Sequence, residues 1–81
     1  MKYREIVFIQ GEEANEPLDI LNNEGEEKAM EYLQQWDYGN ENLITEHEQP
    51  FGTTDILYKK DNYIMSYNKV GYVGLVEVIK E

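Results

Sequence analysis

The chain has 81 residues, no cysteine, and a formal net charge of −10 from 17 acidic and seven basic side chains. This length suits one domain with a small core, and a hydrophobic content of 41% excludes disorder of the chain as a whole. The negative charge disfavours direct contact with nucleic acid or an anionic membrane, and it favours basic partners.

The first predicted element is a strand at residues 3–9, which are rich in β-branched and aromatic side chains. Strict alternation along this strand opposes Ile6 and Phe8 to Val7 and Ile9, so that both of its faces are apolar. Strands of this kind usually lie in the centre of a sheet and are covered on both sides.

Two helical segments are expected after a polar and acidic loop at residues 11–16. Pro17 suits the first turn of a helix, and one short apolar turn is expected to end near residues 22–23. From residue 24 to residue 36, apolar side chains recur at helical spacing and predict a longer helix. Asn23 followed by Glu26 resembles a capping box at its start.

The longer helix is predicted to carry a ridge of carboxylates on its outer face. Glu24, Glu27 and Glu31 fall within a wedge of about 60° if each residue turns by about 100°. The apolar side chains lie on the opposite side and are expected to pack inward. Gly39 and Asn40 suit the C-cap that ends this helix.

The rest of the chain is predicted to form strands. Residues 43–46 are a candidate short edge strand within the polar connection 42–54. Three further strands are expected in a meander, with turns at residues 61–62 and 68–71; they span residues 55–59, 63–67 and 72–79.

The predicted fold class is α+β. One antiparallel sheet of about four strands, in the order β-α-(α)-β-β-β, carries a helical layer on one face. The other face needs a cover, which we expect from the connection 42–54 or from a second copy of the chain. No internal repeat divides the chain, so residues 1–81 are expected to form a single domain.

Several aromatic and glycine spacings resemble those of a group of short acidic bacterial proteins without a known activity. They are Gln35-Trp36-Asp37-Tyr38-Gly39, Asp61-Asn62-Tyr63, Tyr67-Asn68 and Gly71-Tyr72-Val73-Gly74-Leu75. The resemblance covers about residues 17–79 and implies one compact fold. It implies no activity, and Lys69 and Val70 stand where other members vary.

The compartment is expected to be the cytoplasm. Secreted domains of this length usually depend on disulfides, and this chain has no cysteine. Lys2, Arg4 and Glu5 interrupt an apolar stretch that is too short for a signal peptide. No apolar run is long enough to cross a bilayer, so we expect no membrane partner.

Metal and cofactor sites are not expected. His47 is the only histidine, it lies between two glutamates, and no set of zinc ligands accompanies it. The acidic and asparagine-rich stretches 22–27 and 37–41 lack the spacing of a calcium loop. Gly71 and Gly74 precede a strand instead of the helix that a phosphate-binding loop requires.

Neither catalysis nor nucleic-acid binding is expected. No nucleophile, base and orienting residue can be named together, so we predict that the protein is not an enzyme. Four tyrosines of the C-terminal third are candidates for a base-stacking platform; they are Tyr58, Tyr63, Tyr67 and Tyr72. Such a platform needs a basic frame, and the net charge argues for core packing instead.

The acidic side chains carry the positive prediction. Residues 12–48 contain twelve acids and one base, Lys28, whereas residues 1–11 sum to +1 and residues 49–81 to zero. We predict a non-enzymatic interaction module that presents this stretch to a basic protein surface. The predicted interaction residues are Glu12, Glu13, Glu16, Glu24, Glu27, Glu31, Glu46 and Glu48.

Three alternatives remain open at this point. The first is that the acids serve only solubility. The second is that they imitate nucleic acid and inhibit a DNA- or RNA-binding protein, since duplex DNA carries one charge per about 1.7 Å of its axis. The third is a small structural homodimer joined through the uncovered sheet face.

Overall fold

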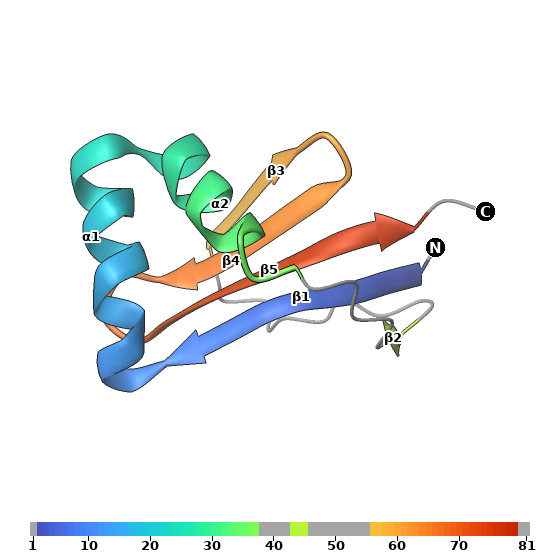
Figure 1. The fold of residues 1–81 in the computed structure, drawn as a ribbon, viewed down its shortest axis with the longest axis horizontal. Coiled ribbons are helices and arrows are strands. Elements are labelled where there is room, and N and C mark those ends of the chain that lie inside the picture. The colour runs from blue at the N-terminus through green and yellow to red at the C-terminus, as the bar shows by residue number, and fades with distance from the viewer. Residues whose placement is uncertain (1, 38–42, 46–55, 80–81) are drawn as a thin grey trace.

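A computed structural model of the chain describes residues 2–37, 43–45 and 56–79. Its elements follow the predicted α+β order (Figure 1). In chain order they are β1 (Lys2–Gln10), the 3-10 helix η1 (Gly11–Ala14), α1 (Asn15–Glu24), α2 (Glu26–Gln34), β2 (Leu43–Thr45), β3 (Ile56–Lys60), β4 (Tyr63–Asn68) and β5 (Tyr72–Ile79).

All strands of the described residues belong to one antiparallel sheet with the order β2-β1-β5-β4-β3. This arrangement confirms the predicted fold class, and with the short edge strand the described part of the sheet has five strands. β2 pairs with the first part of β1, at Tyr3 and Arg4. The two strands that are apolar on both faces, β1 and β5, are neighbours inside the sheet, as their composition predicts.

Both helices lie on the same side of the sheet (Figure 1). Side chains at helical spacing on α1 and α2 meet side chains at alternate positions of β4 and β5. The central members of this core are Leu18, Leu21, Ala29, Met30, Leu33, Met65, Tyr67, Val73 and Leu75. Burial of these side chains holds the helical layer on the sheet.

A β-bulge interrupts β1. Glu5 pairs with Val76 and Val7 with Leu75, which leaves Ile6 as an extra residue between them. Ile6 is buried in the core beside Val7, so the prediction that these two residues face opposite sides is wrong. Phe8 lies on the other face and is 42% exposed.

Gly25 separates the two helices. Its φ of 100° and ψ of 173° are suited to glycine and end α1. α1 is therefore ten residues long and not a single turn, and the predicted loop before it is largely the 3-10 helix η1. The predicted capping box does not form, because Asn23 lies within α1 and α2 has no side-chain cap.

The sheet face opposite the helices also contains buried side chains, among them Ser66 and Val76, which are both 0% exposed. The connection predicted to cover this face lies outside the described residues, apart from β2. Within the described ranges, no helix has the length and apolar character needed to cross a membrane.

Candidate functional site

Six of the eight predicted interaction residues lie in the described part of the chain, and all six are exposed. Glu12 and Glu13 are on η1, and Glu16 and Glu24 are on α1. Glu27 and Glu31 are on α2; Glu46 and Glu48 lie outside the described residues.

The structure does not place the predicted carboxylate ridge on a single helix. Glu24 is the last residue of α1, whereas Glu27 and Glu31 belong to α2, because the helical path breaks at Gly25. The helical periodicity that grouped these three carboxylates therefore applies only to Glu27 and Glu31.

The two ridge carboxylates on α2 each have a basic partner. The Lys60 ammonium on β3 donates to Glu27 Oε1, and this contact lowers the pKa of the Glu27 carboxyl. Lys28 Nζ lies 3.5 Å from Glu31 Oε2, one turn away on the same helix. Both pairs are solvent-exposed, so they reduce the local negative charge without contributing much stability.

A third pairing joins the segment after α2 to the sheet. Arg4 donates from Nη1 and Nη2 to the two carboxylate oxygens of Asp37, each at 2.8 Å. The same guanidinium donates to Glu77 Oε1 from Nε at 3.0 Å and from Nη2 at 2.9 Å. These bonds raise the pKa of Arg4 above its usual value, with Asp37 as the largest cause. The cluster anchors the end of the helical layer to β1 and β5.

The acids of η1 and the first half of α1 differ from these acids in their surroundings. Among the described residues, no lysine or arginine lies within ion-pair distance of Glu12, Glu13, Glu16 or Asp19. They lie on η1 and in the first half of α1, where the positive end of the helix dipole favours negative side chains. This region of the molecule therefore presents carboxylates that no described cation offsets.

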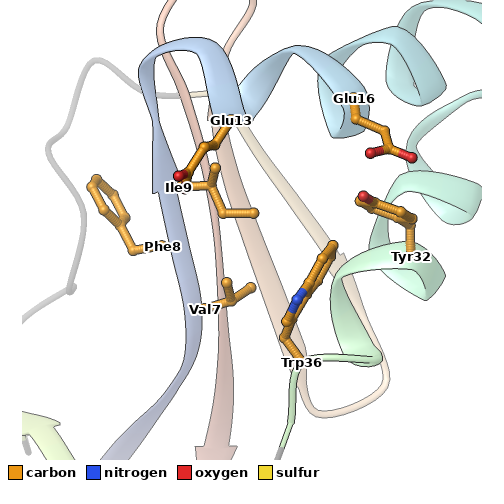
Figure 2. A pocket seen from close by; sticks show the side chains of 7 residues that line it. All are labelled: Val7, Phe8, Ile9, Glu13, Glu16, Tyr32 and Trp36. Atoms are coloured by element: carbon orange, nitrogen blue, oxygen red, sulfur yellow. The ribbon is translucent and has the colours of Figure 1, made fainter.

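A groove of about 470 Å³ lies next to these unpaired acids. Its lining is shown in Figure 2 and comes from β1, η1, α1, α2 and the turn after α2: Val7, Phe8, Ile9, Glu13, Glu16, Tyr32 and Trp36. The side chains of Val7 and Ile9 face the two aromatic rings, whereas the ring of Phe8 points to the other side of β1 (Figure 2).

Tyr32 and Trp36 form an aromatic corner in this groove. Their ring centroids are 4.7 Å apart and their planes meet at 79°. The rings come together because Trp36 follows Tyr32 by four residues and the last turn continues with a bond from Trp36 N to Leu33 O at 3.2 Å. One wall of the groove is thus aromatic, and each ring is only partly buried.

The Glu16 carboxylate approaches the hydroxyl of Tyr32 at the rim of the groove (Figure 2). Burial is the main cause that raises the pKa of Tyr32, and its hydrogen bond with Glu16 is the next. Tyr32 therefore remains a neutral donor at physiological pH. This contact fixes one of the two groove carboxylates beside the aromatic corner.

Glu13 and Glu16 are among the predicted interaction residues, whereas the groove itself was not predicted. Trp36 was expected only as an inward-facing core residue, and Tyr32 was not singled out. Two aromatic residues four positions apart, next to acids of a preceding helix, are the signal that could have indicated a shared site. Strict alternation placed Val7 and Ile9 on one face of the strand, but it did not indicate that this face lies beneath Tyr32 and Trp36.

The four tyrosines considered as a platform do not share one face. Tyr58, Tyr63 and Tyr67 face the helices and pack against the core, where Tyr67 is 5% exposed. Tyr72 lies on the other face, with its ring centroid 5.2 Å from that of Phe8. The expected core packing of these rings is confirmed for the three that face the helices.

Within residues 2–37, 43–45 and 56–79, no group of three or more acidic or histidine side chains is arranged to hold a metal ion. The stretch 22–27, considered for calcium, forms the end of α1 and the start of α2. Gly74 lies within β5 and is followed by more strand. His47 lies outside the described residues.

Comparison of the chain with protein-family models, curated proteins and solved structures finds no match. The resemblance to short acidic bacterial proteins therefore stays a prediction. The function has to be inferred from the surface chemistry, in which the unpaired acids and the adjoining aromatic groove are the outstanding features.

Proposed function

We propose that the protein is a non-enzymatic interaction module that presents an acidic surface to a basic protein partner. The observation that supports this most is the set of exposed acids on η1 and α1 without a described counterion: Glu12, Glu13, Glu16 and Asp19. Clustered charge of one sign steers an oppositely charged partner and selects against a like-charged one.

This surface is centred away from the predicted carboxylate ridge of Glu24, Glu27 and Glu31. Glu27 and Glu31 already interact with Lys60 and Lys28, so part of their field is cancelled within the chain. The carboxylates of η1 and α1 keep their full charge for a partner. In this proposal η1 and the first half of α1 form the main contact, and α2 contributes at its border.

The test is the binding of a short, fluorescently labelled, lysine- and arginine-rich peptide, measured by anisotropy at low and at high salt. Binding is expected to weaken steeply with salt, because the attraction is between exposed charges. In Glu12→Gln/Glu13→Gln, the affinity is expected to fall by about tenfold.

The matched control is Glu27→Gln/Glu31→Gln, which also removes two negative charges, but from carboxylates that already interact with Lys60 and Lys28. It is expected to lower the affinity by less than about threefold. Equal losses in the two double variants would show that only the total charge matters. Binding that is indifferent to salt would contradict the proposal itself.

A further inference from the structure

The groove beside the unpaired acids has a lining that suits one kind of side chain. We propose that it receives an arginine side chain of the basic partner, an assignment that rests on the proposed function. The floor of Val7 and Ile9, the rings of Tyr32 and Trp36, and the carboxylates of Glu13 and Glu16 each match a different part of arginine.

The apolar floor matches the stem of the ligand. Val7 and Ile9 offer aliphatic surface from β1, and both are only partly buried in the free protein. The methylene groups of an arginine can lie along such a surface while the charged head reaches beyond it. The partial exposure of these two side chains leaves apolar area that an inserted stem would cover.

The aromatic corner matches the planar head. Arginine stacks on the faces of tryptophan and tyrosine, and tryptophan is the most favourable of the aromatic residues. Because the rings of Tyr32 and Trp36 meet at 79°, a guanidinium that stacks on one ring approaches the other edgewise. A quaternary ammonium gains most from rings on several sides, and this groove supplies two.

The carboxylates match the donors of the head group. Glu13 and Glu16 line the groove, and no lysine or arginine is among the lining residues. Five N–H donors in a planar fork can serve two carboxylates, whereas an ammonium is a compact point charge that does not stack. An anion would be repelled here, and a purely apolar ligand would displace water from the two carboxylates without replacing its hydrogen bonds.

Trp36 makes the inference directly measurable, because it is the only tryptophan of the chain. Three lysine-rich peptides serve as probes, identical except at one central position that holds arginine, lysine or citrulline. Citrulline has nearly the shape of arginine without its charge, and lysine keeps the charge without the plane. The arginine peptide is expected to change Trp36 fluorescence saturably and to bind about tenfold more tightly than either of the others.

Variants assign the effect to the groove. Glu16→Gln is expected to weaken binding of the arginine peptide by about tenfold and to change binding of the lysine peptide far less. The control Glu31→Gln, an exposed carboxylate on α2 outside the groove, is expected to leave the preference for arginine intact. Tyr32→Phe keeps the ring but removes the hydroxyl that holds the Glu16 carboxylate, so it is expected to weaken binding of the arginine peptide, by less than Glu16→Gln does.

The outcomes separate this inference from the proposed function. If all three peptides bind with equal, salt-sensitive affinity and Trp36 fluorescence stays constant, the groove assignment is overturned and the acidic module stands. If the lysine peptide matches the arginine peptide in both readouts, the assignment to arginine is overturned. If no basic peptide binds, both proposals fail.

Discussion

Two regions of the helical layer are both acidic, yet they differ in what surrounds their carboxylates. Beside α2, Glu27 interacts with Lys60, Glu31 with Lys28 and Asp37 with Arg4. On η1 and the first half of α1, no described cation accompanies the acids. One continuous acidic stretch of sequence thus forms two surfaces. In one the carboxylates interact with lysine or arginine side chains, and in the other no described cation lies near them.

The sheet supplies two of the three cations named, and Lys28 on α2 supplies the third. Arg4 is on β1 and Lys60 is on β3, and each meets an acid 33 positions away in the chain. The strands therefore supply cations to α2 and to the segment after it. The sum of charges along the sequence does not reveal which carboxylates lack a nearby cation, because that depends on which strand lies beneath each helix.

The largest expected effect is on the anchored end. In Arg4→Met, Asp37 and Glu77 lose a shared partner whose side chain is 14% exposed, while their own side chains are 24% and 27% exposed. Breaking buried pairs costs more than breaking exposed ones, so the free energy of unfolding is expected to fall by about 3 kcal/mol. Urea denaturation followed by circular dichroism measures this change.

Lys59→Met is the control for Arg4→Met, because it removes a cation from an exposed position on β3. It is expected to leave the urea midpoint nearly unchanged. If both variants were destabilised equally, loss of positive charge alone would explain the result, and the anchoring role of Arg4 would be wrong.

The next effect concerns Tyr67, which links the sheet to the first turn of α2. Its hydroxyl donates to Glu26 Oε2 at 2.9 Å, and burial followed by this bond raises the pKa of Tyr67 from 10.0 to about 12. Because the folded-state value is the higher one, the contribution to stability is complete below about pH 10 and is lost as the pH rises through about 12. Unfolding experiments between these values are expected to show a loss of about 2 kcal/mol.

Tyr67→Phe removes the titrating group and is expected to make this alkaline loss smaller. At neutral pH the variant is expected to be about 2 kcal/mol less stable, since one hydrogen bond to a carboxylate is missing. Tyr58→Phe on the neighbouring strand is the control for deleting a tyrosine hydroxyl. An unchanged alkaline slope in Tyr67→Phe would refute the assignment.

The smallest expected effect tests whether the ion pairs of Glu27 and Glu31 keep these carboxylates from contributing to binding of a basic partner. Lys28→Gln/Lys60→Gln is expected to leave the urea midpoint almost unaltered, because both pairs are exposed and screened by salt. The affinity for the basic probe peptide is expected to rise by about twofold as Glu27 and Glu31 become available. No gain in affinity would mean that these pairs do not limit binding.

Much of the fold could be predicted because local signals agree with it. The turn at Asp61, where φ is 55°, and the glycines and asparagines around residues 68–71 separate strands with a clear apolar composition. The end of α1 at Glu24 is close to the predicted end near residues 22–23, but the second helix was predicted to begin at residue 24 and to run through Gly25, where the helical path breaks. A single glycine within helical spacing does not reveal whether a helix passes through it or stops.

The site could be predicted only in part, for a different physical reason. Clusters of acids are visible in the sequence, but their counterions are not, since Arg4 and Lys60 reach them through strand pairing. The groove likewise depends on which residues of β1 face α2. That depends on the register of β1 against β5, which is a long-range property.

The extra residue in β1 has a consequence for how this strand can vary. In a regular strand, positions 4 and 7 would point to opposite sides; the bulge lets Arg4 and Val7 share the helix-facing side. The bulge thus divides β1 into two parts. The part before it carries Arg4, which anchors the helical layer, and the part after it carries Val7 and Ile9, which form the groove floor. Substitutions at Val7 or Ile9 are therefore expected to change the groove floor without disturbing the contacts of Arg4 with Asp37 and Glu77.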